Sequence, residues 1–512
     1  MLECAENYFE LPKIIENVIL MTIIDMRMII KANLNQRRVK GIFMLKRKTI
    51  LKILLGYFLF AIAFRFIGGE QFDYKFVTSE MGDPIGAITE IDKDTVVKQT
   101  FLVKEESLES LDIKFATFNR ENKGVLALNL SDETNTELAT GFIDVSTLDE
   151  NTTFKWVLDS PITDAKNKSY TLMLTSDSMQ GEAPAVYLMD TTEEGQTLLV
   201  NDILQENQLC FTHVGKTYFL FGQYYWYGVI GIAILFLLYY LWSEYRERKG
   251  KKTVLTIGCG VWQRYGFLIR QLISRDFKTK YKRSVLGYLW SFLSPLLTML
   301  VQYLVFSKIF KQNIENFPVY LLSGIIIFNF FTDAVGQGLT AIVDNSTLIT
   351  KVYVPKYIYP LTKVVSCSIN LVISTIPLLI VALLTGTTIT KAVFLIPFTL
   401  LCILIFCTGM SMLLCTTMVF FRDTQYLWGI ISMVWMYATP IFYPENIIPN
   451  ELRFIQTLNP VYHCIRFLRI VLIDGVSPEP KAYFFCAFLA AAVLGLGAFI
   501  FKKFQDKFVL YI

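Results

Sequence analysis

The sequence has few of the residues from which catalytic and metal sites are built. Its two histidines, His213 and His463, lie on separate segments, and neither stands at metal-ligand spacing from a cysteine. Charged residues make up 18% of the chain, against about 25% in average soluble proteins. Nine cysteines and 28 glycines are ordinary numbers for 512 residues, which excludes a disulfide-dense or collagen-like scaffold. Neither a metal nor another cofactor is expected.

A nucleotide-binding loop is also missing. The nearest approach is Gly215-Lys216-Thr217, but the phosphate-loop pattern requires a glycine where Cys210 stands. Ion-coupled transporters usually carry ionisable groups at mid-membrane, whereas Asp333 and Lys363 lie near the ends of apolar stretches. We therefore expect neither an enzyme nor a secondary transporter, and energy for any transport would come from a partner.

Apolar residues are abundant and come in blocks. They form 53% of the chain, which excludes intrinsic disorder. A membrane-spanning helix needs about 20 mainly apolar residues. The sequence predicts about eight such spans, at 49–67, 222–243, 285–307, 318–338, 362–384, 392–420, 425–443 and 482–501.

Charge is distributed unevenly around these spans. Residues 68–221 hold 27 acidic and 11 basic side chains, whereas the segments 1–48 and 244–284 hold nine and twelve lysines and arginines. The basic excess flanks apolar blocks, so it indicates cytoplasmic loops rather than nucleic-acid binding. Alternation of eight spans then places both termini in the cytoplasm of a cell-membrane protein and 68–221 outside.

The N-terminal region is difficult to interpret. Residues 1–43 resemble neither a domain nor a targeting signal, and Met44 is followed by Leu-Lys-Arg-Lys, as in a natural translation start. Ala61-Ile62-Ala63 resembles a signal-peptidase site, so the first span is either a retained anchor or a cleaved signal. Both alternatives leave 68–221 outside.

Residues 68–221 contain short β-rich runs separated by turn residues. Runs at 111–118, 124–130, 154–159, 170–176 and 185–189 predict an all-β sandwich of jelly-roll type. Its aromatic residues are either core or sugar-stacking platforms, and we expect core for Phe101, Phe115, Phe118, Phe154 and Trp156.

Three cytoplasmic segments carry further patterns. WQRYGFLIRQLISRDFKTKYKRS (262–284) has apolar residues at helical spacing and many basic residues, as in an amphipathic helix at a membrane surface. The connection 341–360 predicts a short helix capped by Asp344 or Asn345 and ending before Pro355. Phe421-Arg422-Asp423 is a tight polar corner. Each segment could also be an ordinary anchor or loop.

Taken in order, four motifs carry a resemblance to a known family. They are DFKTKYKRSVLGYLWSFLSPL from Asp276 onward, NSTLITKVYVPKYIYPL at 345–361, FFRDTQYLWGIISMVWMYATPIFYP at 420–444 and LNPVYHCIRFLRIVLIDG at 458–475. Over 262–512 the chain resembles the type-2 ATP-binding-cassette permeases that export polysaccharides, O-antigens and teichoic acids. The anchor and outer sandwich at 44–243 depart from the six-span pattern of that family.

The resemblance implies a homodimeric permease that works with two copies of a separate ATP-hydrolysing subunit, in contact with membrane lipids. Together with the β-rich runs and the apolar blocks, it gives a mainly α-helical fold with the β-sandwich inserted. The chain then divides into an extension (1–43), an anchor (44–67), the sandwich (68–221), a helix (222–243), a linker with gate helix (244–284) and the six-span permease (285–512). The cargo would be a lipid-linked glycan.

Site residues follow from the same resemblance. The gate helix would meet the lipid head through Arg275, Lys278, Lys280, Lys282 and Arg283. ATPase docking would involve Asn345, Lys351, Pro355, Arg422 and Asp423. The glycan path would use Trp290, Tyr303, Phe328, Trp435, Tyr437, Arg466 and Arg469, although helix packing or lipid contact is the simpler role for each aromatic.

Two other functions remain open at this stage. The same machine could export drugs or small lipids, which a chromosomal neighbourhood without glycosyltransferases would favour. Alternatively, the chain could be a membrane-anchored glycan sensor with the outer domain as receptor, which would leave the inner segments without a role.

Overall fold

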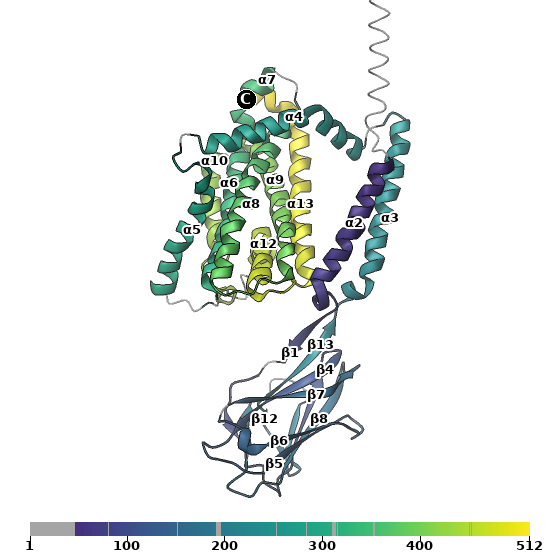
Figure 1. Ribbon diagram of the computed structural model, residues 1–512, viewed down its shortest axis with the longest axis vertical. Helices are drawn as coiled ribbons and strands as arrows, with labels where there is room; N and C mark the ends of the chain where they lie inside the picture. The colour runs from purple at the N-terminus through teal and green to yellow at the C-terminus, as the bar shows by residue number, and fades with distance from the viewer. Residues whose placement is uncertain are drawn as a thin grey trace, which may run out of the picture. The chain divides into compact units, whose positions relative to one another are not determined.

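The computed structural model describes residues 47–511, apart from 80, 151, 191–195, 252, 283, 310–313, 315, 352–353, 450 and 452. It contains two compact units (Figure 1). The membrane unit comprises the described residues up to Gly69 and those from Tyr225 onward, and the β unit is Glu70–Tyr224. The expected extension 1–43 and the alternative start at Met44 lie outside the described residues.

Within the described residues, seven helical segments are long and apolar enough to cross a bilayer. They coincide with seven of the eight expected spans and run Ile50–Phe72, Leu220–Glu247, Gly287–Ser307, Phe317–Asp344, Ile358–Leu384, Lys391–Phe420 and Pro480–Tyr511. At about 1.5 Å per residue, each can match about 30 Å of hydrocarbon. The expectation of a mainly α-helical, multi-pass membrane protein is confirmed.

The eighth expected span, 425–443, is only partly helical. Helix α10 covers Thr424–Ala438, 15 residues that extend about 22 Å, which is shorter than the hydrocarbon core. The apolar run continues to Tyr443, but Pro440 lacks the backbone N–H that a helix interior requires. Composition alone therefore overestimated the length of this helix.

The core of the membrane unit is built around helix α6 (Phe317–Asp344). In its most apolar stretch, 78% of the residues are buried, against 6% in the segment that contains α5 (Trp290–Tyr303). Helices α8 (Ile358–Leu384) and α9 (Ile396–Phe420) pack against α6, and α13 (Pro480–Phe504) packs against α9 (Figure 1). The order α8, α6, α9, α13 defines the bundle.

Helices α9 and α13 approach each other closely. A Cβ placed on Gly497 would lie 2.1 Å from the carbonyl oxygen of Gly409, and a Cβ on Gly409 would lie 2.5 Å from the Cα of Leu494. Small residues allow helix backbones to approach this closely in membranes. The two glycines therefore fix how α9 packs on α13.

Two helices that precede the bundle pair with each other, although the β unit lies between them in the sequence. Helix α2 (Arg47–Gly68) pairs with α3 (Leu220–Arg248) through hydrogen bonds from Tyr57 Oη to the Val229 carbonyl (3.1 Å) and from Tyr225 Oη to the Ala61 carbonyl (2.6 Å). A short turn then leads to α4 (Val254–Lys280), with Gly250 at φ +75°. The hydroxyls of Ser243 and Thr253 lie 2.5 Å apart across this turn.

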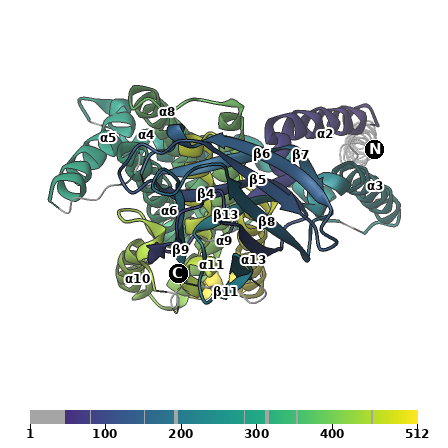
Figure 2. The same cartoon turned by 90° about the horizontal axis from the view of Figure 1, so that it is seen from below.

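The β unit consists of two antiparallel sheets (Figure 2). One has the order β1-β13-β4-β9-β12, with β2 on β9 and β7 on β4, and the other has the order β11-β10-β3-β8-β5-β6. The strands are β1 (Tyr74–Thr78), β2 (Gly86–Ala87), β3 (Val97–Val103), β4 (Ser107–Ala116), β5 (Val125–Ser131), β6 (Glu137–Asp144), β7 (Thr153–Thr163), β8 (Lys168–Ser176), β9 (Ala185–Met189), β10 (Thr197–Val200), β11 (Ile203–Gln205), β12 (Gln208–Leu209) and β13 (Phe211–Tyr218). The expected sandwich is confirmed.

The aromatic residues expected in the sandwich core differ in their outcome. Phe101, Phe115 and Trp156 are buried in the core, and Phe154 packs against it. Phe118 is 46% exposed, with a φ of +57° beside the guanidinium of Arg120, so the core prediction is wrong for this residue.

One carboxylate of the β unit holds several backbone and side-chain donors together. Glu150 accepts hydrogen bonds from Tyr187 Oη (2.5 Å), from Thr117 N (2.7 Å) and Oγ1 (2.8 Å), and from Asn119 N (3.1 Å). The Tyr187 hydroxyl, with the Thr117 and Asn119 donors, lowers the pKa of Glu150 to about 2 despite its partial desolvation. The ionised carboxylate therefore stabilises this loop cluster.

We predict that Glu150→Gln lowers the thermal midpoint of the β unit by about 2–4 °C at pH 7. The lowered pKa means that the stabilisation is complete above the unfolded value of 4.5 and is lost as the pH falls toward about 2. The difference between variant and parent should shrink over that interval. Limited proteolysis of the full chain during heating would measure it, with Glu121→Gln as an exposed control; a pH-independent difference would contradict the prediction.

Candidate functional site

Helix α4 is amphipathic, as its sequence predicts. It begins at a capping box, in which Thr256 Oγ1 accepts from the backbone N–H of Thr253 (2.8 Å). Ile269 and Leu272 are buried against α8 and the end of α6, while Lys278 and Lys280 of the last turns are exposed. One face of α4 is therefore fixed to the bundle, and the other presents positive charge.

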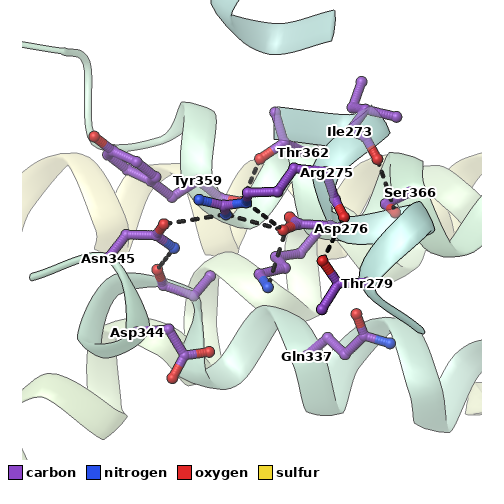
Figure 3. Close-up of polar contacts among 12 residues, drawn as sticks. Ile273, Arg275, Asp276, Thr279, Gln337, Asp344, Asn345, Tyr359, Thr362 and Ser366 are labelled. Carbon is purple, nitrogen blue, oxygen red and sulfur yellow. Dashed lines mark hydrogen bonds and ion pairs between the residues drawn. The ribbon is translucent and has the colours of Figure 1, made fainter. Parts of the chain in front are cut away.

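A polar junction attaches α4 to two other helices (Figure 3). Arg275 lies between Asn345 and Asp276, with Nη2 3.3 Å from Asn345 Oδ1 and 2.9 Å from Asp276 Oδ1. The Asp276 carboxylate is only 7% exposed, and its Oδ2 lies 3.6 Å from Nζ of Lys363 on α8. We call Arg275, Asp276, Asn345 and Lys363 the polar junction.

The polar junction continues directly into a short helix. Asn345 ends α6, and its carbonyl accepts from Leu348 N (3.0 Å) and Ile349 N (3.0 Å) at the start of α7 (Ser346–Lys351). Leu348 and Ile349 pack against the core beneath α4, whereas Thr347, Thr350 and Lys351 are exposed. Helix α7 thus presents a polar face while Leu348 and Ile349 hold it on the core. The chain then passes Pro355, which is half-buried.

A cavity of about 320 Å³ opens at the C-terminal end of α4, one turn beyond the polar junction. Lys280 Nζ lies 2.7 Å from Asp333 Oδ2 on α6. Asn370 Oδ1 on α8 accepts from Tyr281 Oη (2.9 Å) and Ser291 Oγ (3.0 Å). The cavity is lined by Lys280, Tyr281, Trp290, Ser291, Ser294, Pro295, Ile326, Asn329, Phe330, Asp333, Cys367, Asn370, Leu371 and Ser374.

A second, wider hollow of about 670 Å³ borders the start of α4. The end of α3, the first turns of α4, residues 354–357 and residues 505–506 line it. Lys356 crosses it, with Nζ 2.6 Å from the carbonyl of Gln505. This hollow lies beside the segment that follows α7.

At the far end of α10, Asn459 organises two short helices. Its Oδ1 accepts from Trp435 Nε1 (2.9 Å) and Val461 N (3.0 Å), and its Nδ2 donates to Thr439 Oγ1 (2.8 Å). It thereby caps α12 (Pro460–Arg469), which follows α11 (Arg453–Leu458). At six and ten residues, these helices are too short to cross a bilayer.

The two arginines of α12 have different surroundings. Arg469 is 5% exposed and donates to the carbonyls of Pro440 (2.8 Å), Tyr320 (3.2 Å) and Ile441 (3.3 Å). Arg466 is half exposed, with Nε 3.5 Å from Glu445 Oε2. Arg469 therefore holds the chain after α10 in place, and Arg466 has the access that a ligand contact needs.

The remaining expected site residues are scattered. Trp290 lines the cavity with Lys280, whereas Phe328 is buried against Phe331 and Tyr303 packs near Phe317. Trp435 is half-buried and Tyr437 is 62% exposed, both on α10. Lys282, Arg422 and Asp423 are exposed, and Arg283 lies outside the described residues.

Sequence reasoning assigned no role to three polar residues that the structure brings into these sites. They are Asp276, Lys363 and Asn370. Asp276 is the one acid in the basic segment 262–284, and Lys363 and Asn370 are the one charged and the one amide residue of the apolar stretch 362–384. Such isolation was the available signal, because polar groups in a membrane segment are costly without partners.

Comparison of the sequence with known proteins identifies its family. Residues 268–473 match the model of the ABC-2 type transporter family. The O-antigen export system permease protein RfbA of Myxococcus xanthus is 32% identical over 250 residues, 48% of this chain and 96% of the relative. RfbA of Klebsiella pneumoniae is 30% identical over 249 residues (48% and 95%), and the capsule polysaccharide export inner-membrane protein CtrC of Neisseria meningitidis is 23% identical over 237 residues (45% and 88%).

The chain belongs to the ABC-2 type transporter family, as the four sequence motifs indicated. It is the membrane permease, and membership implies an ATP-hydrolysing partner subunit. About half of the chain matches almost the whole length of these relatives, so the N-terminal region of about 250 residues is additional to them.

Proposed function

We propose that this chain is the permease subunit of an ATP-driven exporter that moves a lipid-linked polysaccharide across the cytoplasmic membrane. The observation that carries the proposal is the match to O-antigen and capsule export permeases over nearly their whole length. The cargo would be an O-antigen, capsular or teichoic-acid type glycan. Two copies of the chain would act with two copies of the ATPase.

The positive-inside pattern supports an orientation. With 1–48 and 244–284 in the cytoplasm, α4 and α7 face the ATPase. The chain after α10 reaches the Tyr320 end of α6, where Arg469 binds the carbonyls of Tyr320 and Pro440, so α13 returns the C-terminus to the cytoplasm. The β unit then lies outside the cell membrane. Helices α11 and α12 would narrow the outer end of the path, and Tyr437, which is exposed on α10, would be available to line it.

The basic residues of α4 support a role in capturing the lipid head. Lys278 on α4 and Lys282 just after it are exposed, and Arg275 and Lys280 also lie on α4. Lysine and arginine form strong charge-assisted hydrogen bonds with a diphosphate. This end of α4 therefore attracts the carrier lipid, together with Arg283.

The polar junction supports a route by which movement of the ATPase reaches α4 and α8. Docking at α7, with Lys351, Pro355, Arg422 and Asp423 as further contacts, moves Asn345. Arg275 and Asp276 pass that movement to α4 and, through Lys363, to α8. A movement of α7 that is driven by ATP hydrolysis is thereby converted into a movement of α4, the gate helix.

We predict that Lys351→Glu reduces co-purification of the ATPase at least about tenfold, because it reverses a charge on the exposed face of α7. Affinity purification from membranes with quantitative immunoblotting measures the ratio of the two subunits. Lys502→Glu, the same reversal at an exposed position of α13, is the control. Undiminished association of the Lys351→Glu variant would refute the docking assignment.

Transport itself tests the function. Vesicles that contain the chain and its ATPase should move a lipid-linked glycan across the bilayer on addition of ATP, detected by protection from added glycosidase. Movement of a hydrophobic drug but not the glycan would identify a drug or small-lipid exporter. Glycan binding without any ATPase partner would favour a sensor.

A further inference from the structure

The cavity beside Lys280 has a chemistry that the lipid head alone does not explain. Its charged residues, Lys280 and Asp333, form an ion pair with 2.7 Å between Nζ and Oδ2, so the pair is neutral overall. A diphosphate that entered the cavity would meet the Asp333 carboxylate as well as the lysine. Electrostatics therefore favour a neutral polar ligand in this cavity.

Amide and hydroxyl groups from four elements converge on the same cavity. Asn370 of α8 accepts hydrogen bonds from Tyr281 and Ser291, which fixes its orientation, and Asn329 of α6 and Ser294 of α5 also line the walls. Such groups both donate and accept, as hydroxyl-rich ligands require. Grouping them among membrane helices is costly unless a polar ligand or water uses them.

One wall of the cavity is aromatic. Trp290 is 41% exposed and lines the cavity, so its ring is available for contact. A ring face flanked by amides, hydroxyls and a carboxylate matches a pyranose, which has apolar C–H faces and a hydroxyl rim. The volume of about 320 Å³ is at the small end of ligand sites, which span about 300–1,000 Å³. It suits one sugar unit rather than a polymer.

We propose that this cavity is a sugar subsite that binds the first sugar unit of the lipid-linked glycan, while the diphosphate stays on the basic face of α4. The inference rests on the proposed function and names the part of the cargo that is recognised. Lys280 and Asp333 hold the cavity in shape and bind sugar hydroxyls.

The position of the subsite gives it a further consequence. Lys280 follows the polar junction by one helical turn, and Thr279 Oγ1 donates to the carbonyl of Arg275 (2.7 Å). A sugar in the cavity therefore stiffens the same turn that contacts Asn345 before α7. Occupancy and ATPase docking share one rigid segment of α4.

Binding to the intact permease–ATPase complex in lipid nanodiscs tests the subsite. The probes are a polyprenyl diphosphate that carries one N-acetylhexosamine and the same polyprenyl diphosphate without sugar. We expect the complex without amino-acid substitutions to bind the glycosylated probe about tenfold more tightly than the sugar-free probe. Trp290→Ala and Asn370→Ala should each remove most of that preference while leaving the affinity for the sugar-free probe within about twofold. Trp262→Ala, at an exposed position away from the cavity, should retain it.

The other outcomes overturn the inference in different ways. Retained preference in both cavity variants would show that the sugar is read elsewhere, and continued glycan transport would leave the proposed function standing. Equal weakening of both probes would assign the cavity to the phosphate or lipid. An unsubstituted complex that has no preference for sugar would refute the subsite, and if it also failed to transport glycan, the proposed function would fall with it.

Discussion

Asp276→Leu is expected to destabilise the membrane unit by about 3 kcal/mol and to uncouple ATP hydrolysis from transport. The substitution removes the carboxylate that pairs with Arg275 and lies 3.6 Å from the Lys363 ammonium, which is itself only 16% exposed. A buried cation without its partner is costly, and α4 loses its attachment to α8. Thermal unfolding of the purified permease measures the first effect, and ATP consumed per glycan moved measures the second.

A second substitution separates charge from packing. In the Asp276→Leu background, Lys363→Met removes the unpaired cation, so most of the lost stability should return. The coupling of ATP hydrolysis to transport should not return, because the ion pair between Asp276 of α4 and Lys363 of α8 is still absent. Full recovery of both properties would mean that the polar junction serves stability alone.

Gly497→Val is expected to lower the thermal midpoint of the permease by about 10 °C, or to prevent its folding. Even the first added carbon would lie 2.1 Å from the carbonyl oxygen of Gly409, and a backbone atom cannot move aside as a flexible side chain can. Helix α13 would have to separate from α9 along its length. Fluorescence-detected size-exclusion chromatography after heating measures this loss.

Gly495→Val provides the matched control on the same helix. A Cβ at Gly495 has no neighbour within 4 Å among the described residues, so this change should leave the midpoint within about 2 °C. Similar losses in the two variants would show that valine harms α13 by itself and that the close approach to Gly409 is not the cause.

Membrane spans were the most predictable part of the fold, because burial in lipid depends on composition over about 20 residues. The failure at 425–443 has a local cause. Pro440 ends the helix while the apolar run continues, and the carbonyls of Pro440 and Ile441 then bind Arg469. A contact between residues 29 positions apart is invisible to a hydropathy window.

The β unit shows the same division between local and distant information. Five strand runs could be read from β-rich patterns, but β13 carries Gly215 and Lys216 and was not expected. Its pairing with β1 and β4 supplies the regularity that its own sequence lacks. Phe118 was assigned to the core by residue type, although its left-handed backbone turns it outward.

The candidate sites divide in this way as well. Lys280 and Trp290 were found because they belong to a basic run and an aromatic stretch that are visible in sequence. The cavity that Lys280 and Trp290 line also needs Asp333 and Asn370, which come from other helices, so it could not be predicted from local sequence. Arg275 and Asn345 are 70 positions apart, so no local pattern joins them.

The tight turn between α3 and α4 leaves no slack at the start of α4. Gly250 reverses the chain, and the Ser243–Thr253 contact holds the two helices together. Helix α4 is thus tied at both ends, at Thr253 to the end of α3 and at Asp276 and Lys280 to α8 and α6. A displacement of α3 would therefore be transmitted along the axis of α4 to the mouth of the cavity.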